Sequence, residues 1–177
     1  CLHIPENRME ELHFNDAEPI LACDKLVVNM PLCPKIYHKG GEAYYDTKND
    51  TITMPKMKTF TDSESYYVTL YHELIHATGH EKRLGRESII HPEKFASDGY
   101  GEEELVAQIG ACFLASLSGC TMANFENDVA YIQHWMSRLR NDKRLLLSAS
   151  SKAQQAVDFI LNTSSVKDDI ESSEEGN

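Results

Sequence analysis

Residues 71–80 read YHELIHATGH, and this stretch constrains the fold of the chain more than any other. His72 and His76 lie four positions apart, so on a helix of about 3.6 residues per turn both imidazoles leave the same face. The residues between them include Leu74 and Ile75, which are apolar and indicate a buried helix, where idle histidines would be costly. The stretch therefore predicts a helix that can hold one metal ion through two histidines.

Glu73 directly follows His72, and on a helix its carboxylate would point just off the line to the metal. From there it can take a proton from a water on the metal rather than bind the metal itself. This HExxH pattern is that of zinc peptidases. The simpler alternative is a helix that happens to carry surface histidines.

A catalytic metal site usually takes three protein ligands and leaves one position free, so a third ligand has to come from elsewhere. His80 is the nearest candidate, but on an unbroken helix it would lie about 12 Å from His72 along the axis. Gly79 would have to break the helix to bring His80 back. The metzincin pattern HExxHxxGxxH needs a third histidine where this chain has Lys82. A closed structural site with His80 as a fourth ligand is a further alternative.

The segment GEEELVAQIG offers a carboxylate from a second helix. Glu104 has Gln108 one turn later, where it can support a ligand histidine by hydrogen bonding, whereas Glu103 has an alanine there. We therefore expect Glu104 to be the third ligand, with Glu103 as the second candidate and Glu102 stabilising the helix N-terminus. Two histidines and a distant glutamate make an open site for one Zn²⁺ per chain, and the same donors also suit other divalent metals.

A peptidase site also needs a hydrogen-bond donor for the oxyanion that forms on the substrate. Tyr100, just before the glutamate helix, is one possible donor, and His80 and His91 are two others. Each of these residues also suits a structural role.

The run EAYYD, the polar turn TKND and the run TITMP predict a β-hairpin with strands at about 42–46 and 50–54. Pro55 ends the second strand and predicts that this strand lies at an edge of a small antiparallel or mixed sheet. An edge strand beside the histidine helix would let an extended peptide pair with it.

Apolar residues at helical spacing predict the histidine helix and a C-terminal helical part. The histidine helix is expected to begin with a capping box of Thr61 and Glu64, with Asp62 or Ser63 as alternative caps, and to end at Gly79. The later helices are expected at about 102–117, 125–140 and 142–161.

The chain is long enough for one domain. We expect residues 1–35 to be an N-terminal linker with a short helical segment, and residues 36–162 to be the α+β domain. Residues 163–177 are rich in acidic side chains and are expected to be a disordered tail.

Charge and cysteine content exclude several classes of function. The formal net charge of the 177 residues is −11, which is unsuited to a phosphate backbone, so we expect no DNA binding from this domain alone. The five cysteines are odd in number and include no CxxC pair, which favours a reducing compartment over a disulfide framework. No apolar run approaches the ~20 residues that span a bilayer, so we expect no membrane partner.

Four blocks occur in an order that resembles a known family: GGEAYYDTKNDTITMP, YYVTLYHELIHATGHEKRLGR, GEEELVAQIGACFL and AYIQHWMSRLRNDKRLLLSASSKAQQAVDFIL. They are similar to the C-terminal zincin-like metallopeptidase domain of ArdC-type antirestriction proteins. The same domain occurs in plasmid primases and in polyvalent proteins of phages and conjugative elements. The resemblance covers roughly residues 36–161.

This resemblance implies a zincin-like α+β fold, a bound divalent metal and a mobile-element or phage protein in the bacterial cytoplasm, where such proteins are thought to protect incoming DNA from restriction. His72 and His76 match the motif histidines, Glu73 the catalytic glutamate and Glu104 the helix glutamate. Gln108 departs from the family, which has a glutamate there. In the family, single-stranded DNA binding belongs to an N-terminal domain, which we expect to be fused to this chain or to cooperate with it.

Two functions of different classes fit these features. The first is a zinc endopeptidase that cleaves a protein or peptide substrate through a water activated by Glu73. The second is a non-proteolytic binding module that recognises DNA or a restriction enzyme. The intact HExxH pattern favours the first, and the substitution Glu73→Ala separates the two, because only a peptidase would lose its function.

Overall fold

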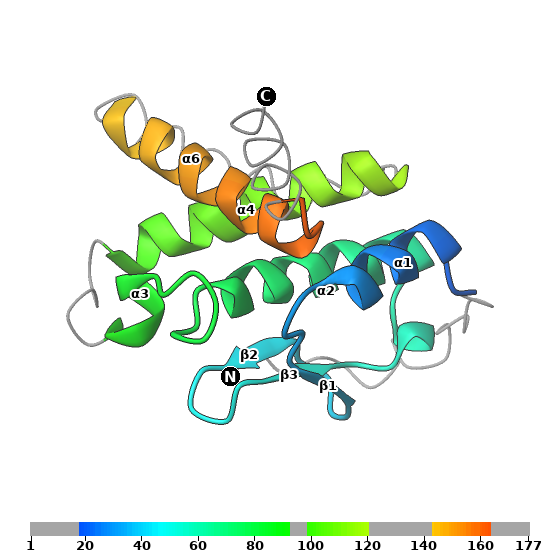
Figure 1. Ribbon diagram of the computed structural model, residues 1–177. Coiled ribbons are helices and arrows are strands. Elements are labelled where there is room, and N and C mark those ends of the chain that lie inside the picture. The colour runs from blue at the N-terminus through cyan, green and yellow to red at the C-terminus, as the bar shows by residue number, and fades with distance from the viewer. Residues whose placement is uncertain (1–17, 93–98, 121–142, 164–177) are drawn as a thin grey trace, which may run out of the picture.

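The computed structural model describes residues 18–92, 99–120 and 143–163. α2 lies between a small sheet on one side and α4 on the other, and α6 packs on α4 (Figure 1). The predicted α+β class is confirmed by this arrangement. The elements are α1 (Leu21–Asn29), β1 (Lys35–His38), β2 (Tyr44–Asp46), β3 (Thr51–Met54), the 3-10 turn η2 (Met57–Thr59), α2 (Ser63–Thr78), α3 (Glu87–Ile90), α4 (Gly99–Ser118) and α6 (Lys143–Ile160).

The sheet has the strand order β1-β3-β2. β2 and β3 form the predicted antiparallel hairpin, with Tyr45 opposite Ile52. The turn between them is held by Asp46, whose carboxylate accepts from the backbone of Lys48 and Asn49. Asp50 supplies the positive φ of 52° that closes the turn.

The prediction that the TITMP strand lies at a sheet edge was wrong. β1 pairs parallel to β3 on the side away from β2, so β3 is the central strand and β2 is an edge. Pro55 follows the last paired residue of β3, Met54, and so its missing N–H does not interrupt the ladder. β1 was missed because only one of its four residues is even half-buried, which leaves no hydrophobic alternation to detect.

α2 begins at an N-cap formed by Asp62, whose carboxylate accepts from the backbone N–H of Ser65 at 2.6 Å. Of the caps considered, this one is realised instead of Thr61, whose hydroxyl pairs with the Ser65 hydroxyl. The helix ends at Gly79, as predicted, with an ordinary φ of −75°. Gly79 is required here by packing, because a Cβ at this position would lie 2.6 Å from Ile89 and 3.0 Å from the Arg86 guanidinium carbon.

α4 starts before the expected range and ends at Ser118, with Gly119 at a positive φ of 75° just beyond it. Near its middle, Gly110 faces α2, and a Cβ there would lie 2.6 Å from Ile75 Cδ1. The absence of a side chain at Gly110 therefore lets the two helices approach closely.

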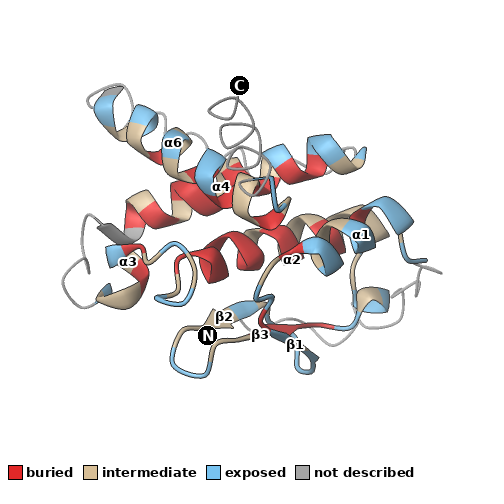
Figure 2. Cartoon of the chain, viewed as in Figure 1, coloured by how far each residue is buried: buried red, intermediate tan, exposed pale blue. Residues whose placement is uncertain are grey.

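The core follows the faces that α2 and α4 turn toward each other (Figure 2). Tyr67, Tyr71 and Leu74 from α2 are almost fully buried, as are Val106 and Leu114 from α4. Each such side chain contributes about 1.5–3 kcal/mol of hydrophobic stabilisation. This burial fixes the position of α2, and thereby of its histidines, against α4.

α1 and α6 confirm two further predicted helices.

The four described cysteines are free thiols, with Cys23 of α1 and Cys120 beyond α4 packed at an Sγ–Sγ distance of 3.0 Å. No helix in the described part of the chain is long and apolar enough to cross a membrane. The helix expected at 125–140, residues 1–17 of the linker and residues 164–177 of the acidic tail lie outside the described residues.

Candidate metal centre

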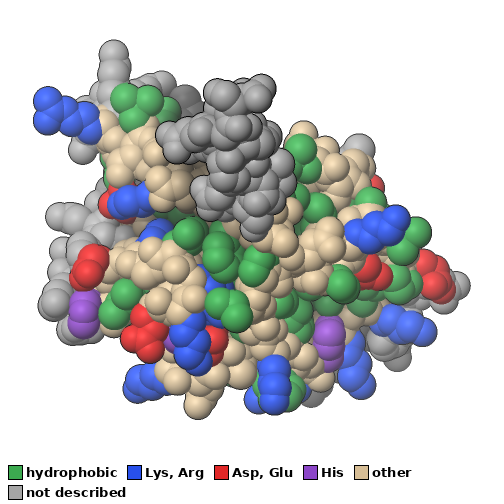
Figure 3. Space-filling view, in the orientation of Figure 1, with side chains coloured by type: hydrophobic (Ala, Val, Ile, Leu, Met, Phe, Trp, Pro, Cys, Tyr) green, Lys and Arg blue, Asp and Glu red, His purple; other side chains and the backbone are tan. Residues whose placement is uncertain are grey.

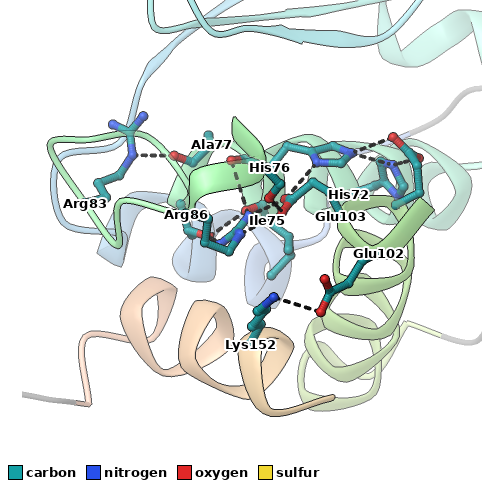
Figure 4. Close-up of polar contacts among 12 residues, drawn as sticks. His72, Ile75, His76, Ala77, Arg83, Arg86, Glu102, Glu103 and Lys152 are labelled. Carbon is teal, nitrogen blue, oxygen red and sulfur yellow. Dashed lines mark hydrogen bonds and ion pairs between the residues drawn. The ribbon is translucent and has the colours of Figure 1, made fainter. Parts of the chain in front are cut away.

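α2 and α4 bring His72, His76 and Glu104 together at one point. Figure 4 shows the two histidines of this cluster. The Nε2 atoms of the two histidines lie 3.1 Å apart. Glu104 places Oε2 at 3.4 Å from His72 Nε2 and Oε1 at 3.4 Å from His76 Nε2. These three side chains are the two predicted histidines and the first choice for the third ligand.

The donor atoms have the spacing expected of ligands around a single ion. Ligands at about 2.0–2.1 Å in a tetrahedral arrangement lie about 3.4 Å from one another. The two histidine nitrogens lie 3.1 Å apart, and each lies 3.4 Å from a different oxygen of the Glu104 carboxylate. His72 and Glu104 each keep about a fifth of the side chain exposed, so one side of the cluster is open. Two imidazoles and a carboxylate with an open side fit a catalytic divalent cation.

Glu103, the second candidate for the third ligand, holds His76 from the opposite side. Its pKa lies well below neutrality, so it accepts a hydrogen bond, and His76 Nδ1 donates to its Oε1 at 3.2 Å. This bond leaves the Nε2 atom of His76 facing the ligand cluster. Gln108 is the residue that the sequence predicts for such support, but within the described residues no hydrogen bond joins Gln108 to either histidine.

Sequence reasoning missed Glu103 in this role because neighbouring helix residues point about 100° apart. Glu103 and Glu104 thus reach two different nitrogens of the same ring. Only the docking of α4 against α2 decides which carboxylate reaches which nitrogen.

Arg86 and Ser88 hold Glu103 in place, and neither was a candidate from the sequence. Arg86 donates to both carboxylate oxygens of Glu103, at 2.6 and 3.0 Å, and Ser88 Oγ donates to Oε2 at 2.7 Å. Arg86 and Glu103 are both buried. The sequence feature that could have indicated Arg86 is its position shortly after the end of α2, where basic side chains often bind the last carbonyls of a helix.

The charges of this network shift the pKa values of its members. Burial works to raise the pKa of Glu103, but hydrogen bonds from His76 and Arg86 outweigh it and lower the pKa to about 2. Burial likewise works to lower the pKa of His76, but the two glutamates outweigh it and raise the pKa to about 9. The pKa of Glu104 is lowered by the two histidines against the opposing effect of burial. Both glutamates are therefore ionised at neutral pH.

Glu73 lies at the same site and is buried. Burial raises its pKa, against smaller opposing effects of His76, His72 and the Tyr45 backbone N–H. Glu73 lines a cavity of about 680 Å³ together with the histidines and both glutamates. The other wall of this cavity comes from β2 and its turn, including Tyr44 and Thr47. The edge strand at the site is therefore β2, not the TITMP strand.

Two of the candidate oxyanion donors, His80 and His91, lie apart from this cluster. His80 accepts from the backbone N–H of Lys82 at 3.2 Å and lines a separate cavity of about 260 Å³. It is absent from the ligand cluster, which counts against a closed site with His80 as a ligand. His91 does not line the metal cavity. Tyr100 lies in the first turn of α4, and its side chain lies outside what the structure describes.

An HExxH helix beside a sheet edge, with a glutamate from a second helix, defines the class of zincin-like metal centres. The chain belongs to the family described as zincin-like metallopeptidase, whose model matches residues 23–152.

Curated relatives agree with this assignment. The uncharacterized protein y4eC of Sinorhizobium fredii is 30% identical over 145 residues, which cover 82% of this chain and 46% of y4eC. Two DNA primase TraC proteins of Escherichia coli are each 35% identical, over 71% and 82% of this chain but only 8% and 13% of their own lengths. The chain thus spans less than half of each of these relatives.

Solved structures of the antirestriction protein ArdC from plasmid R388 share the fold. The metal-free form aligns with a TM-score of 0.61 at 36% identity, covering 81% of this chain and 50% of ArdC. The Mn(II)-bound form aligns with a TM-score of 0.65 at 36% identity, covering 82% of this chain and 52% of ArdC.

Proposed function

We propose that this chain is a zinc-dependent peptidase that hydrolyses peptide bonds at the centre formed by His72, His76 and Glu104. The observation that carries this proposal is the convergence of the three donor atoms, with Glu73 lining the same cavity. Binding of Mn(II) by the related ArdC supports a divalent metal at this centre. Zinc is the proposed metal because two imidazoles and one carboxylate around an open position are a common zinc set.

A bound divalent cation supplies Lewis acidity, which makes a water a better nucleophile and polarises a carbonyl. We assign to Glu73 the general-base role, in which it accepts the proton of the attacking water and returns it to the leaving amine. Its raised pKa suits both steps, because a carboxyl that titrates closer to neutrality is the stronger base when ionised and holds the proton more readily. The tie from His76 to Glu103 keeps the ligand ring fixed during these proton transfers.

The edge strand β2 offers a docking line for an extended peptide. Its inner side pairs with β3, while Tyr44, Tyr45 and Thr47 border the cavity that contains Glu73. A cavity of about 680 Å³ is within the range of about 300–1,000 Å³ seen for ligand sites. A peptide added to this edge would lie across the metal centre, with backbone hydrogen bonds supplying affinity.

The relatives suggest the setting for this activity. We propose a role in antirestriction or mobile-element transfer in the bacterial cytoplasm, with a protein of the host as the substrate. The net charge of −11 favours DNA binding by another domain rather than by this one. On the face seen in Figure 3, basic and acidic side chains are interspersed, without a continuous basic patch.

The test combines metal content with hydrolysis. Wild type and Glu104→Ala are prepared in parallel, and their zinc content is measured by plasma mass spectrometry. We expect about one zinc per wild-type chain and a large loss in the variant. Full retention of zinc in Glu104→Ala would overturn the ligand set.

Glu73→Gln separates the peptidase from the binding module. We expect this variant to keep its zinc but to lose peptide hydrolysis by about 10²–10⁴-fold, the usual contribution of a general base. The assay uses a quenched-fluorescence peptide library, since the cleavage preference is open. Antirestriction activity that survives Glu73→Gln unchanged would favour the binding module instead.

A further inference from the structure

Arg86 reaches the last turn of α2 from the loop that follows this helix. One of its terminal nitrogens donates to the backbone carbonyl of Ile75 at 2.7 Å and approaches that of His76 at 3.5 Å, and the other donates to Thr78 Oγ1 at 2.7 Å. The carbonyls at a helix C-terminus carry partial negative charge and lack partners within the helix. The guanidinium therefore fixes the end of the helix that carries His76.

The same guanidinium also binds a residue of α4, Glu103. It binds both carboxylate oxygens of Glu103, and one of these oxygens accepts the hydrogen bond from the His76 ring. His76 is thus connected to Arg86 at two points, through its backbone carbonyl and, by way of Glu103, through its imidazole. Figure 4 shows this bridge between the two helices.

We propose that Arg86 is a positioning residue that sets the orientation of His76 at the metal centre, through Glu103 and the end of α2. This proposal rests on the proposed metal site but not on peptide hydrolysis. The planar guanidinium presents five N–H donors in a fixed geometry. In this structure they reach the Glu103 carboxylate, the Thr78 hydroxyl and the Ile75 carbonyl. A lysine has one nitrogen, so it cannot bind both Glu103 oxygens, Thr78 and the Ile75 carbonyl in this geometry.

Arg83 is a matched control in the same loop. Its side chain is almost fully buried, and it likewise donates to a carbonyl near the end of α2, that of Ala77 at 2.6 Å. Its carboxylate partner, however, is Asp50 in the hairpin turn. Arg83 therefore shares the burial, the ion pair and the helix-end contact of Arg86, but has no link to a metal ligand.

The experiment compares Arg86→Lys with Arg83→Lys in the full chain. Zinc affinity is measured by competition with a chromogenic chelator, and the visible absorption of the Co²⁺-loaded protein reports the ligand geometry. We expect Arg86→Lys to weaken zinc binding by about 10–100-fold, as for other groups that orient a metal ligand, and to change the Co²⁺ bands. Arg83→Lys should leave affinity and bands close to wild type, although it also loses thermal stability.

Equal zinc affinities and equal Co²⁺ spectra in the two variants would overturn the proposal, because both would then act only on stability. If Arg86→Lys does not fold, Ser88→Ala tests the same link, since it removes a single hydrogen bond from Glu103. We expect a smaller loss of zinc affinity in that variant, and an unchanged affinity would count against the proposal. A wild type that binds zinc without hydrolysing peptides would overturn the peptidase proposal alone, and a wild type that binds no zinc would overturn both.

Discussion

α2 and α4 both contribute to the metal centre, but they place their residues in different ways. On α2, His72 and His76 face the same point because four residues make about one turn, whatever surrounds the helix. On α4, the neighbours Glu103 and Glu104 have different roles, and only the contact with α2 separates them. Local spacing thus determines the first pair, and tertiary packing determines the second.

The largest effect should come from removing either helix's ligand. We expect His76→Ala and Glu104→Ala each to weaken zinc binding by more than about 100-fold, because a direct ligand contributes more than the 10–100-fold of its supporting groups. Isothermal titration of Zn²⁺ into chelator-treated protein measures both. If one of them binds zinc as the wild type does, the two helices do not share the centre.

The proton on His76 gives a pH dependence to zinc binding. In the metal-free protein its pKa is raised to about 9, because hydrogen bonds to the two glutamates outweigh burial. A raised pKa means that protonation stabilises the metal-free fold fully below about pH 6.5 and that this contribution is lost as the pH rises through about 9.

Zinc requires neutral His76, so zinc binding below pH 9 releases about one proton. The zinc affinity therefore falls about tenfold for each unit by which the pH is lowered. Titrations in buffers of different ionisation enthalpy count the released proton. In Glu103→Gln the release at neutral pH should shrink, since the neutral amide no longer favours the imidazolium. Equal release in wild type and variant would contradict this assignment of the proton.

Glu103→Gln also tests the difference between the two adjacent glutamates. The amide oxygen can still accept from His76, but it offers no charge to Arg86, which becomes a buried unpaired cation. We expect the zinc affinity, after correction for the proton that competes at His76, to fall by about tenfold, at the low end for a supporting group, and thermal stability to fall as well. A loss as large as that of Glu104→Ala would mean that the two residues have similar roles.

The smallest effect on zinc binding should come from the helix contact itself. In Gly110→Ala the new methyl meets Ile75, which is fully buried, so we expect a loss of about 1–3 kcal/mol in unfolding free energy. Zinc affinity should fall less than in Glu103→Gln. Urea denaturation measures the stability.

A double-mutant cycle with Ile75→Ala is the control for this contact. The methyl of Gly110→Ala would occupy space vacated by Ile75, so the two changes should couple by about 0.5–3 kcal/mol. Strictly additive effects would show that the two residues do not control how closely the helices approach.

The sequence predicted those features that depend on near neighbours. The hairpin, the histidine helix and its stop at Gly79 follow from spacing and turn residues, and the choice of Asp62 over Thr61 as cap changed only the first turn. Features that depend on distant pairing were missed. β1 has no pattern of its own and exists through its pairing with β3.

The role of Arg86 was missed for a similar reason. Between it and Glu103 lie sixteen residues, and nothing in the sequence indicates that their side chains meet. Glu104 was chosen because Gln108, one turn later, was expected to support a ligand histidine, and the family resemblance pointed to the same glutamate. No such information pointed to Glu103 as the partner of His76 Nδ1.

The order of the elements has a consequence for how such a unit spreads among proteins. The sheet, the histidine helix, the arginine loop and the glutamate helix follow one another along the chain from Lys35 to Ser118. A single uninterrupted stretch of gene therefore encodes every residue assigned to the centre. Recombination can move that stretch as one unit into proteins of very different length. This fits the relatives described above, in which the matched part makes up from 8% to 52% of the relative's length.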